Sequence, residues 1–141
     1  MKKRCIIFVI SVWILTGCIQ TVHPSDKVRE LSFIVLEERE IPLELKAQIE
    51  KEKTKPFMLT YADKGKLYIA RGYGMQDKTG YSVEVTSLYE TTTAVVIETH
   101  FAGPEKNEKT EDTATYPFVV VELEEVGKEV IFQNKRRSIW N

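Results

Sequence analysis

A short apolar segment near the start of the chain limits how much of it can contribute to a fold. Residues 1–4 are basic, and residues 5–15 are apolar apart from Ser11. Eleven helical residues at about 1.5 Å each cannot cross a hydrocarbon layer roughly 30 Å thick. A basic start followed by a short apolar run is instead typical of a secretory signal peptide, which is removed from the mature protein. We therefore expect residues 1–17 to take no part in the fold.

The four residues that close this segment, Leu15-Thr16-Gly17-Cys18, resemble the lipobox of bacterial lipoproteins. The resemblance implies cleavage before Cys18 and a diacylglyceryl thioether on its sulfur, with acyl chains such as palmitate. It also implies a lipid-anchored protein on the extracytoplasmic face of the cell membrane. The alternatives are an ordinary signal peptide with a chance cysteine, and an anchor that is not cleaved.

The composition of the mature chain excludes several functions. Removing residues 1–17 leaves 124 of the 141 residues, enough for one domain. Three of the 20 basic residues leave with the signal, so 17 remain against 21 acidic ones, a net charge of −4 that offers no footprint for nucleic acid. Cys5 is also removed and Cys18 carries lipid, which excludes disulfides, thiolate metal sites and a cysteine nucleophile. The apolar core must therefore hold the domain together.

The sequence divides into a signal peptide (1–17), a tether (18–31), one domain (32–134) and a basic tail (135–141). The apolar run at residues 33–36 predicts a buried strand. Residues 42–53 alternate in a way that fits a strand, but their leucine, glutamate, lysine and alanine content favours a helix, and Pro42 suits its first turn.

The rest of the domain has the pattern of short strands separated by turns. Residues 116–123 are apolar on both faces, so we expect them to form a central strand. Residues 102–115 are polar and predict a loop. The predicted fold is α+β and mainly β: an antiparallel sheet of about six to seven short strands with one helix near residues 42–53. Two strands are half-buried, and their predicted inward-facing residues are Tyr81, Val83, Val85 and Tyr89 in one and Val95, Ile97 and Phe101 in the other.

Residues 43–132 resemble the C-terminal domain of the PrcB family, described as protease complex subunits. The match is carried by the helix with its following proline turn, by Gly74 to Val85 with its Thr-Gly-Tyr-Ser-Val element, and by Pro104 followed after a polar loop by Thr-Tyr-Pro-Phe. The sequence departs from the family in having Gly80 alone where a second glycine is usual, and Lys78 where proline is frequent. The resemblance implies a lipoprotein that associates with a cell-surface protease and supports its stability or assembly, without being the protease.

The segments that match the family supply the candidate interaction residues. Turns and aromatic side chains of this kind are enriched at protein interfaces. The same residues also serve as determinants of the fold, since glycine enters a turn easily and proline suits the edge of a strand. The candidates are Thr79, Gly80, Tyr81, Ser82, Tyr116, Pro117 and Phe118.

No catalytic or metal-binding pattern stands out. Ser82 and His100 fall on outward positions of neighbouring predicted strands, but Ser82 lacks the Gly-x-Ser-x-Gly context of a hydrolase nucleophile. The acidic stretch 105–112 is interrupted by lysine and lacks the spacing of a calcium loop. We therefore expect no enzyme activity, no metal and no other cofactor.

Two functions remain open. The first is a membrane-anchored, non-catalytic accessory subunit, bound to the membrane through lipid on Cys18 and associated with a secreted or surface protease. The second is an envelope lipoprotein that binds a small ligand or a peptide, the peptide by strand addition at an exposed sheet edge.

Overall fold

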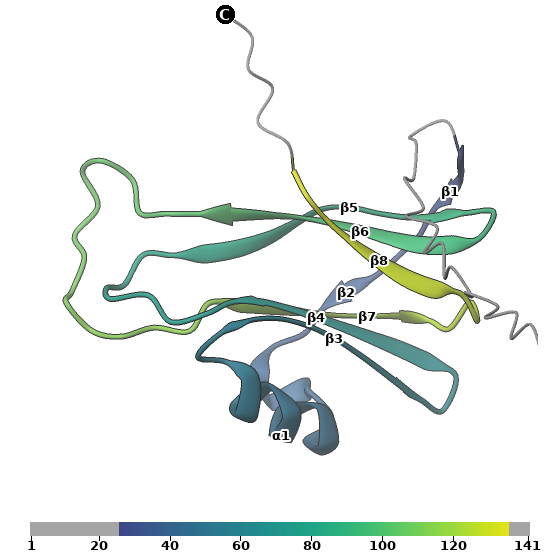
Figure 1. Cartoon of the computed structure of the whole chain (residues 1–141), viewed down its shortest axis with the longest axis horizontal. Helices are drawn as coiled ribbons and strands as arrows, with labels where there is room; N and C mark the ends of the chain where they lie inside the picture. The colour runs from purple at the N-terminus through teal and green to yellow at the C-terminus, as the bar shows by residue number, and fades with distance from the viewer. Residues whose placement is uncertain (1–25, 136–141) are drawn as a thin grey trace, which may run out of the picture.

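The computed structural model describes residues 26–135, which form two four-stranded sheets and one helix. The two sheets lie face to face, and the helix lies against the outer side of one of them (Figure 1). In spatial order the first sheet contains β1 (Lys27–Glu30), β5 (Ser82–Thr91), β6 (Ala94–Ala102) and β8 (Glu129–Asn134). The second sheet contains β2 (Ile34–Val35), β7 (Phe118–Glu124), β4 (Lys66–Tyr73) and β3 (Pro56–Asp63). A short 3₁₀ helix, Glu38–Glu40, precedes α1 (Leu43–Glu52).

The predicted fold class, mainly β with one helix, is confirmed. The strands form two sheets instead of one, and the pairing is antiparallel at every junction except that between β6 and β8, which is parallel. The parallel pair arises because the chain leaves β6, crosses to the second sheet as β7 and returns as β8. The pairing is thus mostly antiparallel, and the last strand is the exception.

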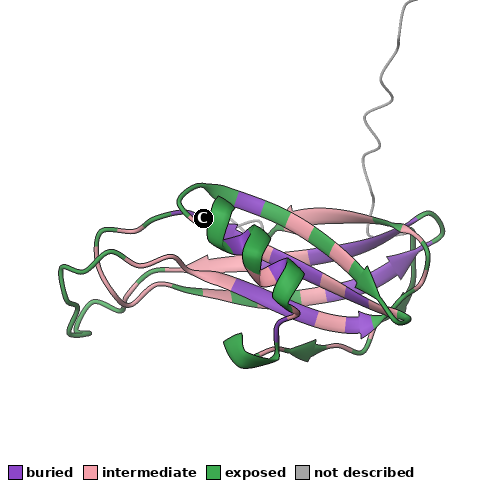
Figure 2. Cartoon of the chain, turned by 90° about the horizontal axis from the view of Figure 1, so that it is seen from below, coloured by how far each residue is buried: buried purple, intermediate pink, exposed green. Residues whose placement is uncertain are grey.

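The central strand of the second sheet is apolar on both faces, as predicted for residues 116–123. From β7, Val119 and Val121 face the first sheet, whereas Val120 faces the helix. The core between the sheets is completed by Leu67, Ile69, Leu88, Val95, Ile97 and Leu123. Burial of each such side chain stabilises the fold by about 1.5–3 kcal/mol relative to exposure, so both faces of β7 contribute. Figure 2 shows buried residues along the strands that the helix covers.

The helix forms where strong helix formers follow Pro42, which confirms the predicted helix near residues 42–53. Two pairs of apolar residues in α1 are spaced four apart, and either pair could form the face that packs on the sheet. Leu45 and Ile49 face the sheet and are fully buried against Phe57 and Ala70, whereas Leu43 is 80% exposed. Residues four apart share one helix face, so α1 covers the second sheet with a single narrow stripe.

The apolar run 33–36 does not form the buried strand that it predicts. Only Ile34 and Val35 pair, with β7, and both are more than half exposed because β2 is the edge of its sheet. The flanking residues are the ones that are partly buried: Phe33 packs on the core between the sheets, and Leu36 on the core beneath the helix. In addition, β1 lies inside the range 18–31, so the first sheet includes the last residues of the predicted tether.

A β-bulge changes which residues of β5 face the core. The register with β6 shifts between Val85 and Ser87, so that Leu88 joins Val83 and Val85 on the inward face. The predicted inward position of Tyr89 was wrong, because an extra residue in one strand reverses the alternation beyond it. Within residues 26–135, no helix has the length and apolar character needed to span a bilayer.

Candidate functional site

Two loops, residues 74–81 and 103–117, lie together at one end of the two sheets (Figure 1). We call them the loop pair. Gln76 and Thr115 exchange backbone hydrogen bonds of 2.8 and 2.9 Å, and the Thr115 hydroxyl donates to the Lys78 carbonyl at 2.9 Å. Thr79 donates its N–H to the Glu111 carbonyl, and its hydroxyl accepts from the Glu111 N–H at 2.9 Å. These hydrogen bonds give the polar loop pair a defined shape.

Gly80 brings the two family-like motifs into contact. Its φ is +96°, a conformation open to glycine and strained for other residues. A Cβ at this position would lie 2.7 Å from the Cβ of Pro104, which is closer than two carbons can approach. The glycine therefore satisfies both a backbone requirement and the packing of the second loop against the first.

Three aromatic rings stack beside the loop pair and join the two sheets. Tyr73, from β4, lies 4.6 Å from Phe101 of β6 with 8° between the ring planes. Tyr81 lies 5.4 Å from the same Phe101 ring, at 11°. We call these three residues the aromatic stack. All three are half-buried, so the stack holds this end of the sandwich together while leaving part of its surface open to solvent.

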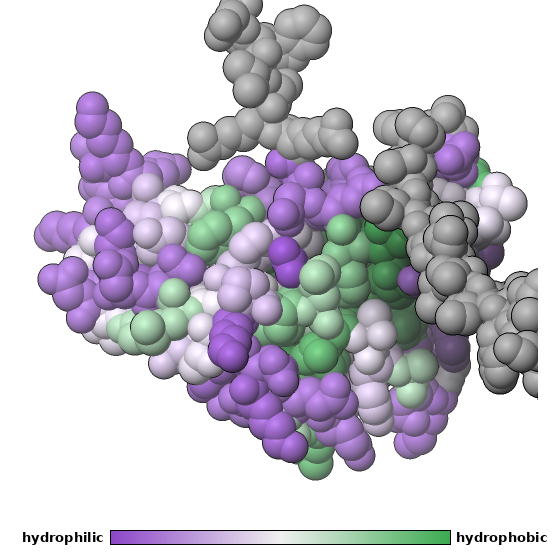
Figure 3. Space-filling view, viewed as in Figure 1, coloured by the Kyte–Doolittle hydropathy of each residue, from purple (hydrophilic) through white to green (hydrophobic). Residues whose placement is uncertain are grey.

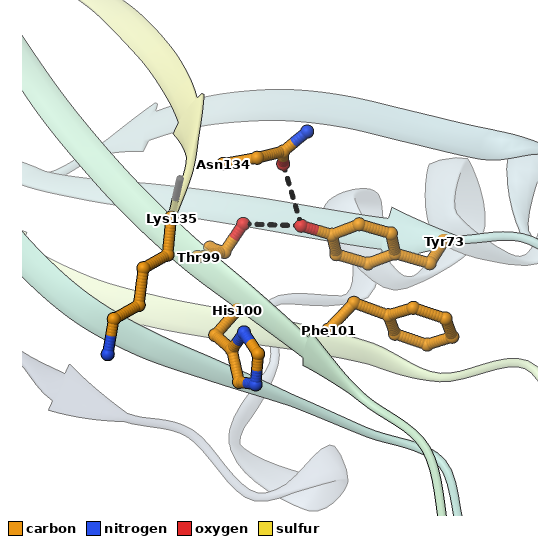
Figure 4. A pocket seen from close by; sticks show the side chains of 6 residues that line it. All are labelled: Tyr73, Thr99, His100, Phe101, Asn134 and Lys135. Carbon is orange, nitrogen blue, oxygen red and sulfur yellow. Dashed lines mark hydrogen bonds between the residues drawn. The ribbon is translucent and has the colours of Figure 1, made fainter. Parts of the chain in front are cut away.

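A small surface pocket of about 200 Å³ adjoins the aromatic stack. Figure 4 shows the Tyr73 hydroxyl at its centre, accepting from Thr99 at 2.7 Å and donating to the Asn134 side chain at 2.9 Å. The pocket is smaller than the usual 300–1,000 Å³ of small-molecule sites. Its lining residues are Tyr73, Thr99, His100, Phe101, Asn134 and Lys135.

The predicted interaction residues do not form one continuous surface. Thr79 and Gly80 belong to the loop pair and Tyr81 to the aromatic stack, but Phe118 packs into the core beneath the helix, 6.4 Å from the Phe57 ring. Tyr116 and Pro117 also belong to the loop pair, and Ser82 follows it directly at the start of β5. Ser82 begins β5 opposite Ala102, Pro117 accepts a 3.2 Å hydrogen bond from the Tyr73 N–H, and Tyr116 lies beneath the Lys53 ammonium at 4.8 Å. Cys18 lies outside the described residues.

The strand register separates Ser82 from His100. His100 lies directly opposite Glu84, whereas Ser82 lies opposite Ala102, and no hydrogen bond between Ser82 and His100 occurs in the described structure. Across residues 26–135, no group of three or more histidine, cysteine, aspartate or glutamate side chains is placed to hold a metal ion.

Arg71 is a notable residue that the sequence reasoning did not single out. It shares the inward face of β4 with Leu67, Ile69 and Tyr73. Its guanidinium lies 4.7 Å from the Tyr73 ring centroid and donates a long 3.3 Å hydrogen bond to the Phe57 carbonyl. Its Nε is buried without a hydrogen-bond partner, and in the described structure no salt bridge includes it. An arginine at an inward position of an alternating strand is the signal that marks it.

A charged cluster ties the opposite end of the first sheet together. Glu90 accepts from Arg29 of β1 at 2.6 Å and from Lys128, just before β8, at 2.7 Å. The hydrogen bonds from Lys128 and Arg29 lower the pKa of the Glu90 carboxyl below its ordinary value. Lys128 also donates to the Thr91 carbonyl at 2.8 Å, so this cluster holds the edge strand and the last turn in place.

The comparisons support the family resemblance over part of the chain. The family model described as PrcB C-terminal matches residues 67–124, which run from the second residue of β4 to the last residue of β7. The match thus includes β4 to β7, the loop pair and the aromatic stack, and it confirms the resemblance for this span. No curated protein and no solved structure gave a significant match.

Proposed function

We propose that this protein is a lipid-anchored, extracytoplasmic accessory subunit that supports the assembly or stability of a cell-surface protease complex. The observation that carries the proposal is the match of the PrcB C-terminal family model over residues 67–124. Resemblance to that family implies a protease complex subunit. The lipobox-like Leu-Thr-Gly-Cys ending at Cys18 supports the anchor. A non-catalytic role is part of the proposal.

The two ends of the first sheet lie far apart, which supports a membrane-side role for one end and a partner-binding role for the other. Lys27 pairs with Thr91 beside the turn that joins β5 and β6, whereas Ser82 and Ala102 lie at the other end of that hairpin, next to the loop pair. Ten strand residues at about 3.3 Å each separate the two ends by roughly 33 Å. A lipid on Cys18 would join the domain at the first end, and we propose that the loop pair points away from the bilayer.

A partner contact at the loop pair follows from this orientation. The loops are partly exposed, residues 105–114 fully so, yet hydrogen bonds fix their shape, so binding there would cost less ordering than binding by an unstructured segment. The loop pair also lies within the span that matches the family. We therefore assign the partner contact to the loop pair of the proposed subunit.

The anchor is tested by Cys18→Ser in the full-length chain expressed in its own cells. The variant is expected to appear in the medium or to stay uncleaved, whereas Cys5→Ser, which changes a residue of the removed segment, keeps the protein in the membrane fraction. Fractionation with immunoblotting measures both. Membrane association of Cys18→Ser at the mature length would contradict the anchor.

The accessory role is tested by purifying the tagged full-length protein from detergent-solubilised membranes. A secreted or surface protease is expected to co-purify in a fixed ratio and to lose stability when the subunit is deleted. Lys109→Glu in the loop pair should reduce the yield of the protease, while Lys64→Glu, in the β3–β4 turn at the opposite end, should leave it unchanged. A preparation without any protease would contradict the proposed function.

A further inference from the structure

We propose that the free edge of β8 receives an extended, acidic segment of the protein partner as a fifth strand of the first sheet. The proposal rests on the proposed function, since it identifies a second contact with the same partner. It joins three observations: an unprotected edge strand, an uncovered face beneath it and an arginine without a counter-ion.

The four sheet edges differ in how well they are protected against strand addition. β1 is short, carries Lys27 and Arg29 and contains a register shift, and β2 has only two residues. β3 begins with Pro56, which cannot donate a backbone hydrogen bond. Charge, bulges, proline and short length are the usual means of blocking an edge. β8 has six residues with Val-Ile-Phe at its centre; its one charged residue, Glu129, stands at its first position, and it contains neither a proline nor a register shift.

The hydrogen bonding of β8 shows which backbone groups face the free edge. β8 pairs with β6 alone, and the Lys135 N–H donates to the Thr99 carbonyl at 2.9 Å. Because the backbone groups of alternate strand residues point to opposite edges, the residues in phase with Lys135 face β6. The N–H and C=O groups of Val130, Phe132 and Asn134 therefore face outwards, ready for an antiparallel or parallel partner.

The space beside this edge is open because β8 does not cover the outer strand of the second sheet. Phe57 and Leu59 of β3 pack beneath the helix, so Met58 and Thr60 point to the side on which the first sheet lies. Both are nevertheless exposed, Met58 to 54%. Figure 3 shows hydrophobic side chains at the surface along the middle of this side of the molecule. A strand added to β8 would extend the first sheet over this uncovered face.

Arg71 gives the added strand its charge. The guanidinium lies against Tyr73, whose hydroxyl is bonded to Asn134 at the end of β8, so the cation lies close to the free edge. Its unpartnered Nε is an unused donor in a partly buried position. A partly buried cation without a counter-ion is costly, and a carboxylate can accept two hydrogen bonds from arginine. An aspartate or glutamate on the inward face of the incoming strand supplies that partner.

The charge requirement is tested with full-length protein in detergent and a pair of fluorescent, end-capped peptides. Both are seven-residue alternations of threonine and valine with a glutamate in the middle of one and a glutamine in the other. The glutamate peptide should bind at least tenfold tighter by fluorescence anisotropy, and Arg71→Gln should abolish the difference, whereas Arg39→Gln, at an exposed site, should preserve it. Equal binding of the peptides, no binding of the glutamate peptide, or a preference that survives Arg71→Gln would overturn the proposal.

The strand geometry is tested by amide hydrogen exchange with the same glutamate peptide. The amides of Val130, Phe132 and Asn134 should become protected, whereas those of β1 should not change; unchanged exchange in β8 would also overturn the proposal. Neither measurement uses the natural partner. A negative result here therefore leaves the accessory role standing, and the absence of a co-purifying protease refutes that role whatever the peptides do.

Discussion

The ring of Tyr73 stacks on that of Phe101 across the gap between the two sheets, with centroids 4.6 Å apart and 8° between the planes. Nearly parallel aromatic contacts of this kind add about 0.5–1.5 kcal/mol to the free energy of burial. Since Tyr81 also stacks on the Phe101 ring, Phe101 connects β6 both to β4 and to the loop that precedes β5. The stability of this end of the sandwich should depend on that one side chain.

Phe101→Ala is accordingly expected to lower the free energy of unfolding by about 3 kcal/mol, as large-to-small changes of phenylalanine do. Phe101→Leu keeps most of the apolar volume and should cost less than half as much. Urea unfolding followed by tyrosine fluorescence or circular dichroism measures both. If the two variants were equally destabilised, loss of stacking alone, and not loss of volume, would account for the effect.

Tyr73→Phe separates the hydrogen bonds of the stack from its ring contacts. The hydroxyl that binds Thr99 and Asn134 is removed, and each lost hydrogen bond should cost about 1 kcal/mol of unfolding free energy. Tyr116→Phe is the control, because no hydrogen bond of the Tyr116 hydroxyl occurs in the described structure. A Tyr73→Phe variant as stable as the wild type would show that the hydroxyl is equally well satisfied by water.

Gly80→Ala tests the contact between the two loops. The substitution combines a strained φ of +96° with a clash against Pro104, and should cost about 1–3 kcal/mol of unfolding free energy. Gly127→Ala is the matched control: its φ is +64°, and nothing lies within 4 Å of the added Cβ. The difference between the two variants in thermal unfolding isolates the packing of the loop pair, and identical effects would argue against that packing.

The Glu90 cluster predicts that the free energy of unfolding decreases at acidic pH. Because Lys128 and Arg29 lower the pKa of the folded-state carboxyl, the unfolded state binds more protons in this range, and stability falls with falling pH. The contribution is fully present above about pH 4.3, the ordinary glutamate value, and is lost as the pH drops through the folded-state pKa. Glu90→Gln should lower the unfolding temperature at pH 7, and its stability should decrease less with falling pH than that of the wild type. If the stability of the variant decreased with falling pH as steeply as that of the wild type, other carboxyls would account for the pH dependence.

Much of the fold follows from local pattern. The helix is predictable because Leu45 and Ile49 lie four apart among strong helix formers, and the central position of β7 is predictable because its valines leave no polar face. The turn at Gly80 is likewise predictable, because glycine before a strand indicates a backbone conformation that is strained for other residues. In each case the deciding information lies within a few neighbouring residues.

What was missed depends on contacts between distant segments. The bulge in β5 cannot be seen in an uninterrupted alternation, so Tyr89 was placed on the wrong face and Leu88 overlooked. The exposure of Ile34 and Val35 follows from their place at a sheet edge, which a single apolar run does not reveal. The parallel pairing of β8 and the isolation of Arg71 both result from how the strands are ordered in space.

The place of β8 has a consequence for how the chain folds. The β3–β4 and β5–β6 hairpins are local and can form early, but β8 pairs with a strand that precedes it by a loop and a whole crossing of the second sheet. Such non-local pairing slows folding, because the chain loses loop-closure entropy before the non-local contacts form and stabilise it. The sandwich therefore closes only when residues 129–134 become available, so pairing of the last described strand is the step that completes the native state.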